Sequence, residues 1–196
     1  WSLADGGIRN PGEVIPAAER TGAIVHIGHS MLSQACSQIV AWANVGIGNV
    51  PISVNLSPRQ FKDANLIKDI HDIVLKYQVP SHLIELELTE SSILADKEDA
   101  LRKLLELRDL GFKISIDDFG SGYSSFAKLK DYPIDCVKID KSFIDPLPED
   151  SKANIVTKAI IELAHALECT VLAEGVEYEE QVNFLKHAGC DSFQGY

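Results

Sequence analysis

The chain lacks the cysteine and histidine patterns of a zinc site or a disulfide framework. Its four cysteines and six histidines are scattered, with no Cys-x-x-Cys pair and no His-Glu-x-x-His motif. Free thiols in a reducing compartment are therefore expected. No apolar run is long enough to span a bilayer and no signal peptide opens the chain. A cytoplasmic domain is expected, and a membrane anchor elsewhere in a full-length protein stays open.

Positive charge is also scarce. The chain has 18 basic residues against 29 acidic ones, a formal net charge of -11. This deficit argues against duplex nucleic acid or an anionic membrane as the main partner. An anionic ligand would need positive charge from another source, and a divalent cation held by carboxylates would supply it.

The dinucleotide-binding motif Gly-x-Gly-x-x-Gly is absent too, and this absence bears on the fold. A β-rich run, a polar loop and an amphipathic helix recur along the 196 residues, which predicts parallel β-α-β units in one domain over residues 1–196. Such a series forms either an open doubly wound sheet or a (β/α)8 barrel, and the missing motif favours the barrel. Strands are expected at residues 50–56, 83–89, 112–118, 135–140, 170–174 and 191–195.

The stretch KISIDDFGSGYSS, residues 113–125, is the most unusual part of the chain. It reads as a buried strand that ends in two adjacent carboxylates, Asp117 and Asp118, followed by a loop with Gly120 and Gly122. Taken alone, the two aspartates could be turn residues that cap a short helix. By strand parity Asp118 points away from Asp117, so we expect the glycines to twist the chain after the strand if both acids serve one site.

Strand parity separates an aliphatic face from a polar face on each expected strand. The aliphatic faces suit packing against helices, which leaves the polar side chains to converge on the mouth of the barrel. Several buried carboxylates together imply a cation, because each isolated one would cost several kcal/mol. The converging residues are Asn55, Glu87, Asp117, Lys138, Glu174 and Gln194.

Each of these residues also has a simpler explanation. Asn55 could be a turn residue, and Glu87 with Glu90 could lie on a solvated edge strand. Lys138 and Asp140 could form a structural ion pair. Glu174 and Glu177 could open a helix, where acids favour the N-terminus. Polar ends on all six strands are nevertheless hard to explain as six independent turns.

Six segments in order resemble the EAL-domain phosphodiesterases, which hydrolyse the bacterial messenger cyclic di-GMP. They are VNLSPRQF, ELELTES, IDDFGSGYSS, PIDCVKIDKSF, LAEGVE and FQGY, and the resemblance covers nearly all of residues 1–196. It implies a modified (β/α)8 barrel of the TIM type. It also implies two divalent cations, Mg²⁺ or Mn²⁺, at the carboxyl-terminal mouth, in keeping with oxygen ligands.

The resemblance implies a role for each matching residue. Asn55, Glu87 and Asp117 match metal ligands, and Asp118 matches a ligand of the second ion. Lys138 matches the lysine that holds the attacking water and the charge near it, and Glu174 a general base or second-metal ligand. Four further residues match the surroundings of the site. Gln194 lies near metal-bound water in the family, Glu90 anchors the loop after Asp118, Glu177 lines the site, and Asp140 lies beside it.

The Glu-Ala-Leu tripeptide that names the family is absent, because the sequence begins at Trp1, just beyond the place where the tripeptide belongs. We expect the first strands of the barrel and the end of the last strand to lie outside it. The missing glutamate would be a metal ligand, so these 196 residues by themselves are expected to be weakly active or inactive.

Three functions compete. The leading one is hydrolysis of cyclic di-GMP to linear pGpG by the complete domain, because the DDF, lysine and glutamate motifs are all present. The second is an inactive domain that binds cyclic di-GMP as a receptor or interacts with a protein. The third, without the resemblance, is a metal-assisted enzyme that abstracts a proton with Lys138. The resemblance also implies a homodimer and additional sensory or cyclase domains.

Overall fold

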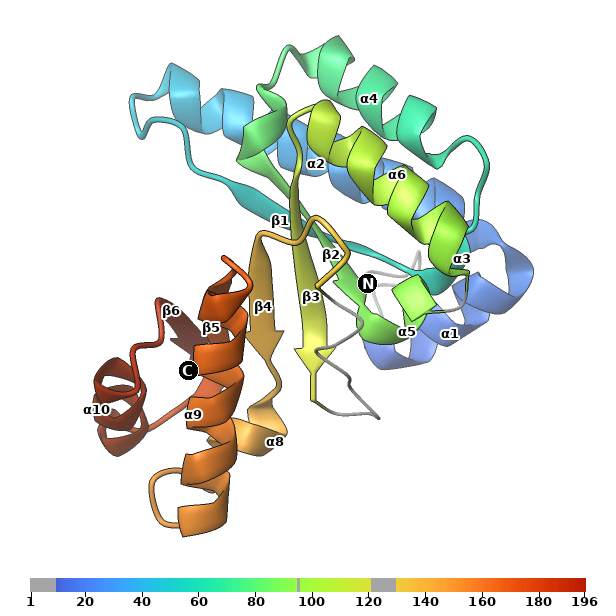
Figure 1. Ribbon diagram of the computed structural model, residues 1–196. Coiled ribbons are helices and arrows are strands. Elements are labelled where there is room, and N and C mark those ends of the chain that lie inside the picture. Colours follow the sequence, from blue (N-terminus) through green and yellow to red (C-terminus); the bar gives the residue numbers. More distant parts are fainter. Residues whose placement is uncertain (1–9, 95, 121–129) are drawn as a thin grey trace. The chain divides into compact units, whose positions relative to one another are not determined.

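The computed structural model describes residues 10–94, 96–120 and 130–196, and helices and strands alternate along them (Figure 1). Contacts group the chain into two compact units, residues 1–84 and 85–196. Among the described residues no helix is both long and apolar enough to cross a bilayer. The four cysteines are free, as expected.

The first unit is built around a long helix. Its elements are α1 (Pro11–Thr21), α2 (Ala23–Asn44), β1 (Ile52–Leu56), α3 (Pro58–Phe61), α4 (Leu66–Tyr77) and the 3-10 helix η1 (Ser81–Leu83). Helix α2 contacts α1, β1, α3 and α4. In β1 the side chains alternate as expected: Val54 and Leu56 are buried, whereas Asn55 is exposed.

A capping box ends β1 and begins α3. The Ser57 hydroxyl accepts a hydrogen bond from the Gln60 amide, and the Gln60 side chain accepts one from the Ser57 amide. Gln60 lies against Gly28 of α2, where an added Cβ would come within 1.8 Å of Gln60 Nε2. The guanidinium of Arg59 donates to the carbonyl of Glu19 at 2.7 Å, at the carboxyl end of α1. The motif SPRQF therefore fastens the residues just after Asn55 to both helices.

The second unit is a parallel sheet with helices between its strands. The bounds are β2 (Ile84–Thr89), α5 (Glu90–Leu94), α6 (Lys97–Asp109), β3 (Lys113–Phe119), β4 (Cys136–Ile139), α8 (Lys141–Ile144), α9 (Ser151–Ala166), β5 (Thr170–Val176), α10 (Glu179–His187) and β6 (Ser192–Gly195). Strands β2 to β6 pair in sequence order and all in parallel. A doubly wound sheet reverses its order at a switch point, so this sequential order favours the barrel.

The aliphatic face of these strands forms the core, as parity predicted. Leu86, Leu88, Ile114, Ile116, Ile139, Val171 and Ala173 are all essentially inaccessible to solvent. Helix α6 contacts β3, and α9 contacts β4 and β5, where Figure 1 shows it lying along these strands. The other face carries polar groups, and Glu87, Ser115 and Lys138 are buried there.

Two aspartates tie the strands together at their amino ends. Asp135, just before β4, accepts a hydrogen bond from the Ile114 amide of β3 at 3.0 Å. Asp191, just before β6, accepts one from the Val171 amide of β5 at 2.8 Å. Each aspartate thus accepts a hydrogen bond from an amide near the start of the preceding strand in the sheet. Asp191 also lies 2.8 Å from His165 Nε2.

Replacing Asp191 by asparagine should lower the free energy of unfolding at neutral pH by about 1 kcal/mol, because the half-exposed carboxylate accepts two hydrogen bonds. Burial alone would raise the pKa of Asp191, but hydrogen bonds from His165 and the Val171 amide lower it overall. Its contribution is therefore complete above the ordinary value of 3.8 and is lost as the pH falls through the lowered folded-state pKa.

Urea unfolding of Asp191→Asn and wild type at pH 7 and in strong acid measures this difference. Glu162→Gln, an exposed acid of α9, is the control. Equal stabilities at pH 7 would contradict the proposed role of Asp191.

Candidate active site

The Lys138 ammonium lies at the centre of the polar face. Its Nζ is 2.6 Å from Glu174 Oε1, 2.9 Å from Glu87 Oε1 and 3.2 Å from Asp117 Oδ1. The lysine side chain is only 6% exposed. The three acids come from β5, β2 and β3, while Lys138 belongs to β4. Four of the residues that parity predicted to converge therefore do so.

This ammonium is held in its charged form. Burial alone would lower the pKa of Lys138, but hydrogen bonds to Glu174 and Glu87 and the charge of Asp117 raise it overall. Three carboxylates face one ammonium, which leaves two negative charges uncompensated when all are ionised. Burial also raises the pKa of Glu174, with Asp117 and Glu87 adding to the effect against the opposing charge of Lys138.

Asp117 and Asp118 reach the site together through a β-bulge. The register pairs Ile116 with Val137 and then Phe119 with Ile139, so Asp117 and Asp118 both lie opposite Lys138. Asp118 has φ 53°, a left-handed conformation that aspartate tolerates better than most residues. Gly120, directly after β3, has φ 96°, in keeping with the expected twist at the glycines, but the change of direction already begins at Asp118 within the strand.

A second bulge lies beside Glu174. The register pairs Ala173 with Phe193 and then Val176 with Gly195, so Glu174 and Gly175 lie opposite Gln194. Gly175 has φ 70°. The Gln194 amide donates to Glu174 Oε1 at 3.1 Å, which brings this predicted residue into the site. Both bulges thus occur where strands deliver carboxylates.

Asp117, Asp118 and Glu174 can offer oxygen atoms to a single cation. One oxygen of each lies within 4.8 Å of the others. Burial and the charges of Asp117 and Asp140 raise the pKa of Asp118, as expected for a carboxylate crowded by others. An all-oxygen set with surplus negative charge suits a hard divalent cation such as Mg²⁺ or Mn²⁺.

The other predicted residues have different surroundings. The Glu87 carboxylate contacts the Lys138 ammonium. Asp140 caps α8 by accepting a hydrogen bond from the Ser142 amide at 3.0 Å. The alternative ion pair between Lys138 and Asp140 is therefore wrong. Glu90 is the first residue of α5. Asn55 belongs to the first unit, and its placement toward this site stays a prediction.

Glu177 is bound by a residue that the sequence did not single out. Lys141 Nζ lies 2.8 Å from Glu177 Oε1. Neither bulge was predicted either, although the pair Asp117-Asp118 and the glycine after Glu174 were signals that could have indicated them. The predicted loop after Gly120, including Gly122, lies outside the described residues, so its proposed anchoring by Glu90 stays a prediction.

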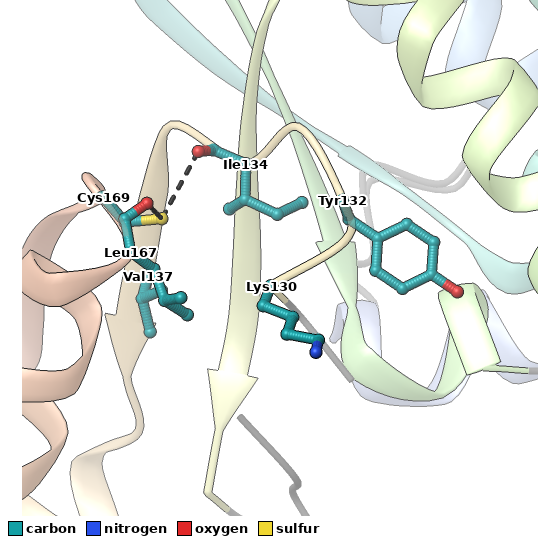
Figure 2. Close-up of a pocket in the computed structure, with 6 residues that line it drawn as sticks. All are labelled: Lys130, Tyr132, Ile134, Val137, Leu167 and Cys169. Atoms are coloured by element: carbon teal, nitrogen blue, oxygen red, sulfur yellow. Dashed lines mark hydrogen bonds between the residues drawn. The ribbon is translucent and has the colours of Figure 1, made fainter. Parts of the chain in front are cut away.

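A small pocket lies at the opposite, amino ends of β4 and β5. Figure 2 shows its lining residues and the hydrogen bond that Cys169 Sγ donates to the Ile134 carbonyl at 3.4 Å. Burial, together with the charge of Asp135, raises the pKa of Cys169, so this thiol is protonated at neutral pH. The lining residues are Lys130, Tyr132, Ile134, Val137, Leu167 and Cys169. None of them belongs to the predicted site.

Comparison with known proteins agrees with this geometry. The family model of the EAL domain matches residues 1–196. The chain belongs to the EAL domain family. A solved structure described as the PaMucR phosphodiesterase in complex with c-di-GMP superposes with a TM-score of 0.93 at 40% identity, covering 100% of this chain and 79% of that one. The prediction of a (β/α)8-type barrel is confirmed.

Two curated relatives of this EAL chain are longer proteins. The signaling protein YkoW of Bacillus subtilis is 44% identical over 192 residues, which is 98% of this chain and 24% of YkoW. The bifunctional diguanylate cyclase/cyclic di-GMP phosphodiesterase MucR of Pseudomonas aeruginosa is 43% identical over 197 residues, which is 100% of this chain and 29% of MucR. The chain thus spans about a quarter of the length of these relatives.

If the acidic cluster holds a divalent cation, Mn²⁺ should stabilise the folded protein. A cation at a hundred times its dissociation constant adds about 2.7 kcal/mol to the free energy of unfolding. Asp117→Asn and Glu174→Gln should lose most of the rise in melting temperature, since each removes a charged oxygen ligand. Differential scanning calorimetry with Mn²⁺ and with EDTA measures this. The control is Asp72→Asn, whose aspartate pairs with Lys68 on α4. An undiminished rise in both site variants would place the cation elsewhere.

Proposed function

We propose that the EAL chain is the catalytic part of a cyclic di-GMP phosphodiesterase that forms linear pGpG. The single observation that carries this proposal is the Lys138 ammonium among Glu87, Asp117 and Glu174, with Asp118 beside them. A receptor without catalytic activity would have no need for this arrangement of buried charges. Burying these charges costs free energy, and the cost is greatest for a buried charge that has lost its partner. Family membership and the phosphodiesterase name of MucR support the same conclusion.

The substrate proposal rests on charge as well as on relatives. Cyclic di-GMP is anionic, and the chain is strongly acidic, so the phosphodiester must meet a local positive charge. Lys138 provides one fixed positive charge. The surplus carboxylates beside it are suited to bind divalent cations, which would add further positive charge. The solved c-di-GMP complex of PaMucR phosphodiesterase supports this ligand class, because all of this chain superposes on it.

We propose two divalent cations, Mg²⁺ or Mn²⁺, as cofactors. Asp117, Asp118 and Glu174 would hold them, with Asn55 and Glu87 as the further ligands that the family resemblance suggests. When bound, such cations neutralise phosphate charge and make water more acidic.

The chain's own residues would contribute position and proton transfer. Lys138 would place a permanent positive charge beside the phosphodiester, where negative charge grows during attack by water. Glu174, whose pKa is raised by burial, would take the proton of the attacking water. Gln194 would orient the Glu174 carboxylate through its amide hydrogen bond. Addition of one water breaks one P–O3′ bond and leaves a 3′ hydroxyl and a 5′ phosphate, as in pGpG.

We further propose that both compact units belong to one EAL-type domain, since a single family model spans them. The greater length of YkoW and MucR supports additional domains in the full-length protein, such as a sensory or cyclase domain. The resemblance supports a homodimer, and sedimentation equilibrium of the full-length protein would test it.

Lys138→Ala and Asp117→Ala should each lower pGpG formation by the full-length protein at least about a thousandfold, because each removes a charge that acts on the reacting phosphate or holds its cofactor. Chromatography of the products from cyclic di-GMP with Mg²⁺ or Mn²⁺ measures the rate. Lys68→Ala, an exposed lysine of α4, is the control.

Two outcomes would contradict the assignment. Unchanged turnover in either site variant would show that these residues do not catalyse the reaction. Tight binding of cyclic di-GMP by the wild type without any cleavage would favour the receptor.

A further inference from the structure

Lys141 connects the ends of two neighbouring strands. It is the first residue of α8, directly after the cap Asp140 that follows β4. Its Nζ lies 2.6 Å from Asp145 Oδ1, one turn further along, and 2.8 Å from Glu177 Oε1. The first contact is an ordinary i,i+4 pair, whereas the second crosses to the residue that follows β5.

The aliphatic stem of Lys141 also lies against the backbone of β5. A Cβ added at Gly175 would stand 2.5 Å from Lys141 Cγ and 2.6 Å from Cδ, closer than carbon atoms approach. Gly175 has φ 70°, a conformation that other residues rarely adopt. The lysine stem therefore lies against the backbone of Gly175, the residue directly after Glu174.

Lys138 and Lys141 together hold β5 on both sides of its bulge. Lys138 binds Glu174 before Gly175, and Lys141 binds Glu177 after it. A bulge interrupts the ladder hydrogen bonds, so the backbone there is less constrained by its neighbouring strand. Side-chain contacts from β4 and α8 supply the constraint that the interrupted ladder cannot.

We propose that Lys141 is a positioning residue for Glu174, which it acts on through Glu177 and Gly175 without contacting the reacting atoms. This inference rests on the proposed function of Glu174 as proton acceptor and cation ligand. The Glu174 carboxylate must lie within reach of both Lys138 and the cation cluster, and a small displacement of its strand would disturb both.

Electrostatics alone predicts the opposite effect on cation binding. Removal of the positive charge that Lys141 carries beside Glu177, three residues after Glu174, should make a divalent cation bind more tightly. A positioning role predicts weaker binding, because the ligand oxygens lose their arrangement. The sign of the change in Mn²⁺ affinity therefore distinguishes the two effects.

The experiment compares Lys141→Met with Lys141→Arg in the full-length protein. Methionine keeps most of the stem and removes the ammonium, while arginine keeps both a stem and a charge. We expect Lys141→Met to lower kcat about tenfold with KM nearly unchanged, since a modest misplacement of a catalytic group costs this order of rate. Mn²⁺ affinity, measured by calorimetry without substrate, should fall about fivefold or more, from the lower end of typical coupling between sites upward. Lys141→Arg should restore both quantities.

Four further variants, one of them a control, test which contact of Lys141 carries the effect. Lys68→Met is the matched control, because Lys68 also pairs with an i,i+4 aspartate at 2.8 Å, on an exposed part of α4 in the first unit. Asp145→Asn should stay close to wild type, since it removes only the pair within α8. Glu177→Gln should resemble Lys141→Met, and the double variant should lose no more than either alone, because the two residues act as one unit.

Several results would overturn the proposal. A raised KM with unchanged kcat would make Lys141 a substrate contact. Unchanged kinetics in Lys141→Met would show that Lys141 does not position Glu174. Tighter Mn²⁺ binding in this variant would show that Lys141 acts on the cation only through its charge. Failure of Lys141→Arg to restore Mn²⁺ affinity would also contradict it. If the wild type binds Mn²⁺ but forms no pGpG, the proposed function fails, and the Mn²⁺ comparison still decides the role of Lys141.

Discussion

The structure around the candidate site depends on one buried ammonium. Lys138 is enclosed by acids from three other strands. Without its positive charge, burial of these carboxylates would cost several kcal/mol each, on the order of the desolvation cost of an ion. Because the acids outnumber the lysine, the arrangement is satisfied only in part. The remaining negative charge suits this end of the sheet to a divalent cation, as the proposed function requires.

The two bulges explain how parallel strands can concentrate so many oxygen atoms. A regular strand directs only every second side chain to one face, which would separate Asp117 from Asp118. The bulge opposite Lys138 brings both to the mouth, and the bulge opposite Gln194 changes the direction of the chain just after Glu174. Each bulge weakens the local ladder, which is why side-chain contacts such as those of Lys138 and Lys141 matter there.

The two ends of the sheet differ in their polar groups: stabilising hydrogen bonds lie at the amino ends, and the candidate site lies at the carboxyl ends. At the amino ends, Asp135 and Asp191 accept hydrogen bonds from strand amides, and the small pocket of Figure 2 is lined mostly by apolar groups. At the carboxyl ends, acids are gathered at the expense of regular pairing. This division is typical of barrels, whose loops can vary around a stable base.

Much of this protein follows from its sequence by itself. The alternation of apolar and polar residues predicted every strand end to within two residues, and it placed Glu87, Lys138 and Glu174 on one face. Parity is a local property of extended backbone, so a sequence can display it. The motifs, taken together, indicated the family.

Only the tertiary structure decided how these residues pair. Parity separated Asp117 from Asp118, yet the left-handed turn at Asp118 unites them, because a bulge depends on the register between strands distant in sequence. Lys138 could have paired with Asp140 two residues away, but Asp140 accepts a hydrogen bond from the Ser142 amide at the start of α8, and Lys138 contacts acids of three other strands. The contact between Lys141 and Gly175 likewise joins residues 34 positions apart, so no local pattern could indicate it.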